Sequence, residues 1–95
     1  AVGNKGNISE KLLVIELSKG NEKAFRGLYD KYRPDVYAYS LSLLKSSANA
    51  KEVVQEVFLK IWINRNTINP DLSFKSFVFT ITRNLSFNFL KKAEG

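Results

Sequence analysis

The sequence predicts an all-α domain, a small bundle of three to four helices. Apolar side chains recur with the period of an amphipathic helix in several long segments, and no stretch shows the sustained two-residue alternation of a half-buried strand. Short polar stretches rich in Asn, Gly, Ser and Pro separate these segments. A chain of 95 residues with 44% apolar content suits one domain with a small core.

The first helix is predicted from the signals at its two ends. Residues 1–8 contain Gly and Asn without periodicity, so we expect a flexible lead-in to a single domain over residues 9–93. Ser9 can cap a helix over residues 10–19, and Gly20 is a typical residue to end it.

The second helical segment starts after Asn21, a favourable N-cap, and its apolar period continues almost to Ser46. Pro34 interrupts the period, and a proline removes one backbone donor and clashes with the preceding turn. We expect either a kink in one long helix or two helices that meet near Arg33. The period resumes in phase, which favours the kink.

The helix predicted over residues 50–62 has an ordinary inner side and an unusual outer side. Its inner side has the apolar stripe of a helix packed on a core, formed by Ala50, Val53, Val54, Val57, Phe58, Ile61 and Trp62. Its outer side places two apolar side chains among carboxylates and an amide, and consists of Glu52, Gln55, Glu56, Leu59 and Ile63. An apolar centre with a polar rim is typical of a protein interface. The alternative is a solvated face with a stray leucine.

Glu52 and Glu56 also have the spacing of a carboxylate pair for metal binding or acid–base catalysis. Di-metal helical bundles add Glu-x-x-His motifs and further inward-facing carboxylates. This chain has neither His nor Cys, and both Glu are predicted to point away from the core. We therefore expect no metal, no cofactor and no enzyme activity.

A polar loop is predicted over residues 64–73, followed by a helix from Ser73 to about Lys92. The expected core face of this last helix is Phe74, Phe77, Val78, Ile81, Leu85 and Phe89. In the loop, the side chains of Asn64, Asn66, Thr67 and Asn69 could bond to a base edge, and Arg65 could contact a phosphate. The same residue types occur in any turn.

The last helix carries the clearest signal for a polyanionic partner. Its cations are Lys75, Arg83, Lys91 and Lys92, and no carboxylate lies between residues 72 and 93. Away from the core, one side groups Ser76, Phe79, Thr80, Arg83, Phe87 and Leu90. We interpret Phe79 and Phe87 as packing against the first helix, and the basic residues as binding DNA, in agreement with a net charge of +6.

The composition also bears on location. No apolar run approaches the roughly 18 residues that span a bilayer, and the N-terminus has no signal-peptide pattern. We expect a cytoplasmic protein.

Three segments carry a family resemblance: residues 21–32, residues 50–62 with Gln-Glu-x-Phe-Leu-x-x-Trp, and residues 77–84 with Ile-x-Arg-Asn. Together they resemble conserved region two of bacterial sigma factors, in the extracytoplasmic-function (ECF) group. The resemblance covers about residues 20–92, and the combination of the last two motifs is far more specific than either alone.

The resemblance implies a transcription initiation factor domain that recognises and melts the minus-ten promoter element. Glu52, Gln55 and Glu56 match positions that dock on the clamp helices of the largest subunit of core RNA polymerase. The loop over residues 64–73 would help to capture a base flipped from the non-template strand. The last helix, with Arg83 and Asn84 of the matched motif, would read and open the element.

The chain departs from the family pattern at several positions. Lys51 stands where an acidic residue is usual, Glu52 where Asp is usual, and Asn88 and Lys91 where an Asp and an Arg often occur. Nothing matches the C-terminal helix-turn-helix domain of the family, so we expect an isolated first domain. The alternative function is a helical interaction module that an anti-sigma regulator binds, without DNA binding of its own.

Overall fold

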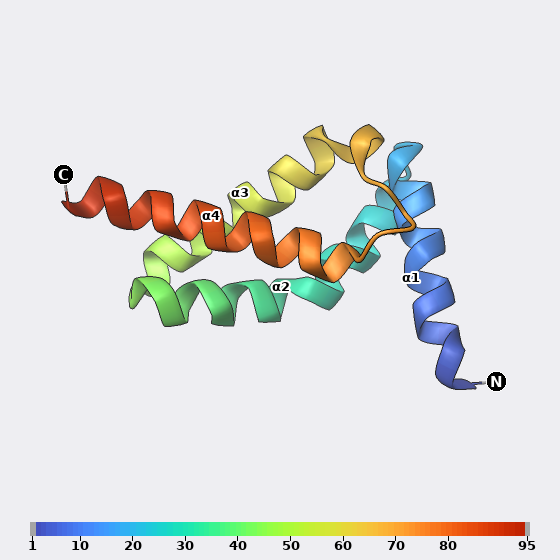
Figure 1. Ribbon diagram of the computed structural model, residues 1–95, viewed down its shortest axis with the longest axis horizontal. Helices are drawn as coiled ribbons and strands as arrows, with labels where there is room; N and C mark the ends of the chain where they lie inside the picture. Colours follow the sequence, from blue (N-terminus) through green and yellow to red (C-terminus); the bar gives the residue numbers. More distant parts are fainter. Residues whose placement is uncertain (1, 95) are drawn as a thin grey trace.

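A computed structural model describes the backbone of residues 2–94 and the side chains of residues 10–92. It contains α1 (Val2–Ser18), α2 (Glu22–Leu44), α3 (Ser47–Ile63), the short 3-10 helix η1 (Arg65–Thr67) and α4 (Phe74–Glu94). Helices α2, α3 and α4 pack on one another, and α1 crosses the end at which α2 begins (Figure 1). The predicted all-α bundle is confirmed, and none of its described helices is long and apolar enough to cross a membrane.

Helix α1 begins at Val2, so the predicted start at residue 10 is wrong. Apolar periodicity reports which helical face is buried, and a helical stretch without such a face gives no signal. The side chains of residues 1–9 lie outside the described residues, and the flexibility of the lead-in stays a prediction. The helix ends as expected, because Gly20 adopts a left-handed φ of 88° and its N–H bonds to the Leu17 carbonyl.

Helix α2 is one continuous helix that contains Pro34, so the alternative of two helices is wrong. Asn21 caps it as predicted, accepting hydrogen bonds from the backbone N–H groups of Lys23 at 2.9 Å and Ala24 at 3.2 Å. Pro34 is exposed, so its ring faces solvent. The kink itself stays a prediction.

The inner side of α3 forms the centre of the core, as predicted. Its buried residues are Ala50, Val53, Val54, Val57, Phe58 and Ile61, while Trp62 is half-buried. They pack against Leu17 of α1, Leu28 and Val36 of α2 and Val78 of α4, which are also buried.

The core face of α4 differs in part from its predicted stripe. Phe74, Val78 and Leu85 are buried and Phe77, Ile81 and Phe89 half-buried, but Thr82 and Ser86 are fully buried and were not predicted. The Thr82 hydroxyl donates to the Val78 carbonyl at 2.8 Å, and the Ser86 hydroxyl lies 3.1 Å from that of Ser40 in α2. These bonds offset the cost of burying hydroxyls.

The predicted packing of two α4 aromatics against the first helix is wrong. Phe79 packs edge-on against Tyr39 of α2, with ring centroids 5.6 Å apart. Phe87 is 45% exposed. Helix α1 lies across the opposite end of the bundle from the C-terminal half of α4, so it cannot cover Phe87 (Figure 1).

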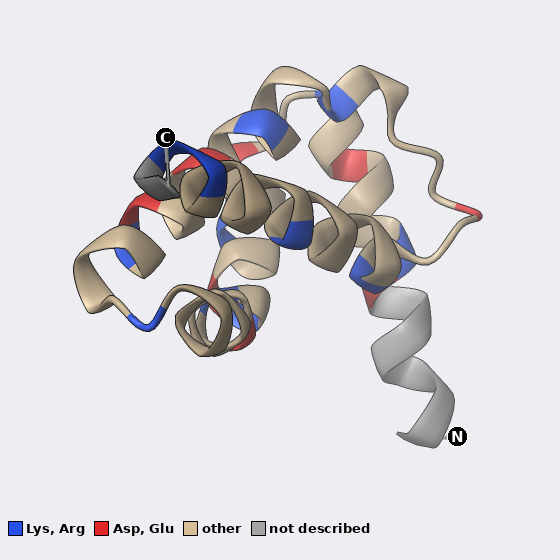
Figure 2. Cartoon of the chain, turned by 60° about the vertical axis from the view of Figure 1, so that its left-hand side comes forward, with Lys and Arg blue, Asp and Glu red and all other residues tan. Residues whose placement is uncertain are grey.

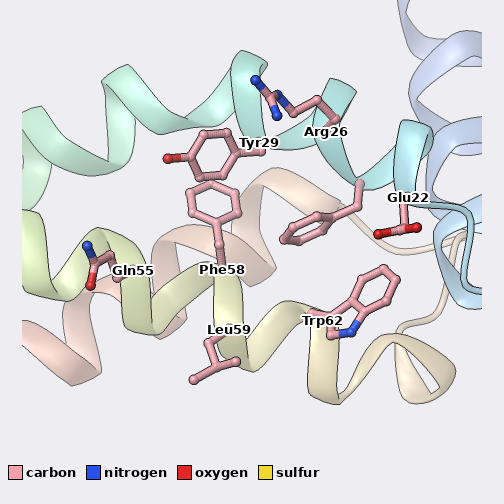
Figure 3. A pocket seen from close by; sticks show the side chains of 8 residues that line it. Glu22, Arg26, Tyr29, Gln55, Phe58, Leu59 and Trp62 are labelled. Atoms are coloured by element: carbon pink, nitrogen blue, oxygen red, sulfur yellow. The ribbon is translucent and has the colours of Figure 1, made fainter.

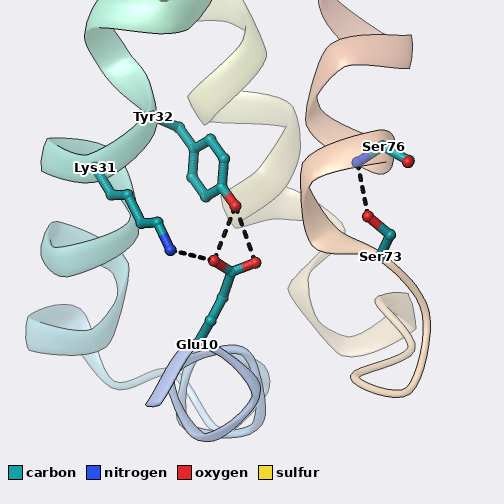
Figure 4. A network of polar contacts seen from close by, with 5 residues as sticks. All are labelled: Glu10, Lys31, Tyr32, Ser73 and Ser76. Atoms are coloured by element: carbon teal, nitrogen blue, oxygen red, sulfur yellow. Dashed lines mark hydrogen bonds and ion pairs between the residues drawn. The ribbon is translucent and has the colours of Figure 1, made fainter. Parts of the chain in front are cut away.

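A polar cluster ties α1 to α2 (Figure 4). The Tyr32 hydroxyl lies 2.9 Å from both carboxylate oxygens of Glu10 and donates to that group, and Lys31 pairs with the same carboxylate. Tyr32 is only 5% exposed. Burial, and then the hydrogen bond to Glu10, raise the pKa of Tyr32 well above its ordinary value of 10.0.

This raised pKa predicts a loss of stability in alkaline solution. Above the ordinary pKa the unfolded chain releases the Tyr32 proton while the folded chain retains it, so the free energy of unfolding should fall as pH rises. Tyr32→Phe should remove that component of the decline. Urea unfolding of both proteins from about pH 9 to 11 measures it, and parallel declines would contradict the assignment.

Candidate interaction surfaces

The outer side of α3 is exposed along its whole length. We call Glu52, Gln55, Glu56, Leu59 and Ile63 the α3 outer face, and all five are exposed. Leu59 is 57% and Ile63 63% exposed, which places two large apolar side chains in solvent one turn apart. The predicted orientation of this helix is therefore confirmed, and its binding role stays a prediction.

An aromatic groove borders the α3 outer face (Figure 3). It encloses about 820 Å³ between α2 and α3 and is lined by Glu22, Phe25, Arg26, Tyr29, Gln55, Phe58, Leu59 and Trp62. Ring centroids are 5.2 Å apart for Phe25 and Trp62 and 4.8 Å apart for Tyr29 and Phe58. The sequence assigned Phe58 and Trp62 to a core stripe, and the number of aromatic rings on two facing helices was the available signal for a groove.

The loop between α3 and α4 is held by its own polar side chains. Asn64 Nδ2 donates to the Lys60 carbonyl at 2.9 Å, and Thr67 Oγ1 donates to the Asn64 carbonyl at 2.8 Å. Asn69 Oδ1 accepts from the Asp71 N–H at 2.9 Å. Asn66 is exposed, and its side chain makes no hydrogen bond to any residue whose side chain is described. Of the predicted loop residues, Asn66 is therefore the freest to meet a ligand.

A second cleft lies between this loop and the first turns of α4. It encloses about 490 Å³ and is lined by Thr67, Ile68, Asn69, Leu72, Ser73, Phe74, Ser76, Phe77 and Thr80. We call it the loop cleft. It brings together the predicted residues Thr67 and Thr80 and adds hydroxyls at Ser73 and Ser76. The Ser73 hydroxyl accepts from the Ser76 N–H at 3.1 Å, so it caps α4 beside the cleft (Figure 4).

The predicted basic residues of α4 are all exposed but do not converge. Lys75 lies beside the loop cleft in sequence, Arg83 and Asn84 near the middle of the helix, and Lys91 and Lys92 near its C-terminal end. At 1.5 Å of rise per residue, Lys75 and Lys92 are separated by about 25 Å along the axis. Figure 2 shows basic bands and no acidic band along the described part of α4. This helix presents a basic track that starts at the loop cleft.

Arg65 differs from the other predicted cations, because it is half-buried. Its guanidinium carbon lies 4.3 Å from the centroid of the Trp62 ring, and its Nη1 donates to the Trp62 carbonyl at 2.8 Å. The sequence analysis identified Arg65 only as a basic residue in a polar loop, with no sign of this stacking.

Sequence comparison relates these surfaces to known proteins. A family model described as sigma-70 region 2 matches residues 28–95, which contain α3, the loop cleft and α4. The chain belongs to the sigma-70 region 2 family. The ECF RNA polymerase sigma factor SigW of Bacillus subtilis is 23% identical over 79 residues, 83% of this chain and 42% of that protein. The ECF RNA polymerase sigma-E factor of Escherichia coli is 30% identical over 83 residues, 87% of this chain and 43% of that protein.

Both of these relatives are named ECF sigma factors, and this region 2 domain is similar to part of each. It spans less than half the length of the curated relatives it matches. An engineered region 2 of sigmaE, solved in complex with GTAAAA, has a TM-score of 0.80 and 26% identity, covering 87% of this chain and 86% of that one. CnrH, solved in complex with the cytosolic domain of CnrY, shares the fold with a TM-score of 0.80 and 22% identity, covering 84% of this chain and 52% of that one.

Proposed function

We propose that this region 2 domain binds core RNA polymerase through the α3 outer face and binds and melts the minus-ten promoter element through the loop cleft and α4. The observation that carries the proposal is the loop cleft at the head of a helix with four exposed cations and no described carboxylate. A pocket for a base followed by a track for phosphates is the arrangement that an opened strand needs.

The polymerase contact rests on the chemistry of the α3 outer face. Leu59 and Ile63 supply apolar surface that would be removed from water on binding. Around them, a polar rim is formed by Glu52, Gln55 and Glu56. Two carboxylates would favour a basic surface on the clamp helices of the largest polymerase subunit. The exposed cation of Lys51 lies next to Glu52 and reduces the local negative charge.

The loop cleft suits a base that has left the double helix. Half-buried Phe77 offers a ring on which a flipped base can stack, while Thr67, Ser73, Ser76 and Thr80 offer hydroxyls to its edge. The solved complex of a sigmaE region 2 with GTAAAA supports oligonucleotide binding by a domain of this fold. From the cleft, the strand would continue along α4 past Lys75, Arg83 and Asn84 toward Lys91 and Lys92.

Melting then needs no covalent step. Opening a base step costs a few kcal/mol. A protein that binds the unstacked strand more tightly than the duplex shifts the equilibrium toward the open form by that difference in affinity. Any contacts of polymerase to the same strand would add to this difference, so the complex should open DNA better than the domain alone.

Salt dependence tests the DNA track. In a complex of this chain with core RNA polymerase, Lys75→Gln and Arg83→Gln should each weaken binding to single-stranded DNA. Each should also lower the slope of log affinity against log salt by about one, because a lost phosphate contact releases one counterion fewer. Fluorescence anisotropy from about 50 to 200 mM salt measures both.

Lys19→Gln is the matched control, because Lys19 is an exposed cation at the end of α1 that pairs with Glu16. It should leave the slope unchanged. If all three variants had the wild-type slope, α4 would not be the phosphate track.

The aromatic groove favours a second candidate function, a helical module that a regulator binds without DNA binding. A groove lined by four aromatic rings fits the apolar face of an amphipathic helix, such as a segment of an anti-sigma factor. Salt-independent binding of a protein helix, with no DNA binding in the polymerase complex, would favour this candidate over the first.

A further inference from the structure

We propose that Arg65 is a positioning residue that holds the loop cleft open through Trp62, and that it does not contact a phosphate. The inference rests on the proposed function, because it assigns a role within base capture. It departs from the expectation that every basic residue of the loop and α4 meets the DNA backbone.

The guanidinium of Arg65 is engaged inside the domain on two sides. One face stacks on the Trp62 ring at 4.3 Å from its centroid, and Nη1 donates to the Trp62 carbonyl at 2.8 Å. A stacked, planar cation with a directed hydrogen bond has one preferred orientation. Arg65 therefore fixes the first residue of η1 on the last turn of α3.

The burial of Arg65 opposes a phosphate contact. Its Nε is buried and has no hydrogen-bond partner in the described part of the chain. Gly20 lies on that side: a Cβ at this position would stand 3.9 Å from Nε, so the turn between α1 and α2 covers the guanidinium. Leaving a charged N–H buried without a partner costs free energy. This cost is consistent with a residue whose role is to hold a fixed position inside the domain. A residue that binds a phosphate at the surface would have no need to bury its Nε.

The contacts of Arg65 lead from the helical core to the wall of the loop cleft. Trp62 is itself packed on Phe25 of α2, with ring centroids 5.2 Å apart. Arg65 opens the short helix that ends at Thr67, and Thr67 bonds back to the Asn64 carbonyl through both its N–H and its hydroxyl. Because Thr67 and the following Ile68 line the cleft, a shift of η1 moves that wall directly.

Two substitutions separate positioning from phosphate binding. Arg65→Lys keeps the charge but loses the planar stack, and Arg65→Gln loses the charge as well. The probe is a single strand selected from a random pool for binding to the complex of this chain with core RNA polymerase. The affinity of each protein for this strand is compared with its affinity for strands that lack one base, with every position tested in turn. The slope of log affinity against log salt is also measured for each protein.

We expect the wild-type protein to bind a strand that is abasic at one position much more weakly than the intact strand. Both variants should lose this difference in affinity. Affinity for the intact strand should fall about tenfold, the scale of one base-stacking contact. Affinity for the strand that is abasic at the captured position, and the salt slope, should stay at wild-type values.

The control is Asp71→Asn in the same loop. Asp71 pairs with Lys11 at 2.9 Å, but both side chains are largely exposed, so the pair contributes little. This variant should discriminate like wild type.

A phosphate contact would give a different pattern, which would overturn the inference. Arg65→Lys would then bind like wild type, and Arg65→Gln would lower the salt slope by about one and weaken intact and abasic strands equally. Retained discrimination in both variants would also overturn it while leaving base capture intact. If wild type showed no discrimination at any position, base capture itself would fail.

Discussion

Replacing Leu59 with Asp should weaken binding of this region 2 domain to core RNA polymerase by about ten- to hundredfold, the range of an interface residue that matters. Leu59 is 57% exposed at the centre of the α3 outer face, between Glu56 and Ile63. An aspartate there would bury a charge at the apolar centre of the interface while leaving the core of the domain untouched. Titration of labelled core polymerase with each variant measures the loss.

Leu12→Asp is a matched control for this experiment. Leu12 is 56% exposed and lies on α1, away from the α3 outer face. The same chemical change there should leave polymerase affinity unchanged. Equal losses for the two variants would indicate a non-specific effect of charge, and no loss for Leu59→Asp would exclude the α3 outer face as the contact.

Replacing Ile61 with Ala should cost about 2–5 kcal/mol of unfolding free energy, the range for deleting a large buried aliphatic side chain. Ile61 is fully buried, two residues along the same helix from Leu59. Truncation leaves a cavity that the surrounding residues of α2, α3 and α4 can fill only in part. Urea or thermal unfolding measures the change.

Ile63→Ala makes the same chemical change on the exposed side of α3. Ile63 is 63% exposed, so its truncation should cost less than about 0.5 kcal/mol. It should instead weaken polymerase binding. If the two variants were equally destabilised, the assignment of α3 to an inner and an outer side would be wrong.

Helix α3 could be predicted almost completely because its two sides differ in composition along the whole length. The wheel separates Val53, Val57 and Ile61, which are buried, from Glu52 and Leu59, which are exposed. The buried face of α4 was harder to predict, because burial of Thr82 and Ser86 depends on hydrogen-bond partners for their hydroxyls. One of those partners, Ser40, lies in another helix, so the pairing depends on how α2 and α4 cross.

The sequence predicted which types of residue form the candidate sites and which helical faces carry them. It predicted less well how these residues are arranged in space. The sequence indicates that Thr67 and Thr80 are polar and exposed, but only the packing of the loop on α4 brings both to one cleft. The role of Arg65 was missed for the same reason. Its stacking on Trp62 needs the turn into η1, and its burial needs the approach of Gly20, which is distant in sequence but lies at the same end of the bundle.

Selection from a pool of random single-stranded DNA tests the central claim most directly. Core RNA polymerase is offered the pool with and without this chain, and the bound strands are sequenced. We predict that the chain enriches a short motif beyond polymerase alone, that one position in it requires a base, and that Leu59→Asp removes the enrichment. The same bound pool with and without the chain would contradict the claim that this domain carries polymerase to an opened promoter strand.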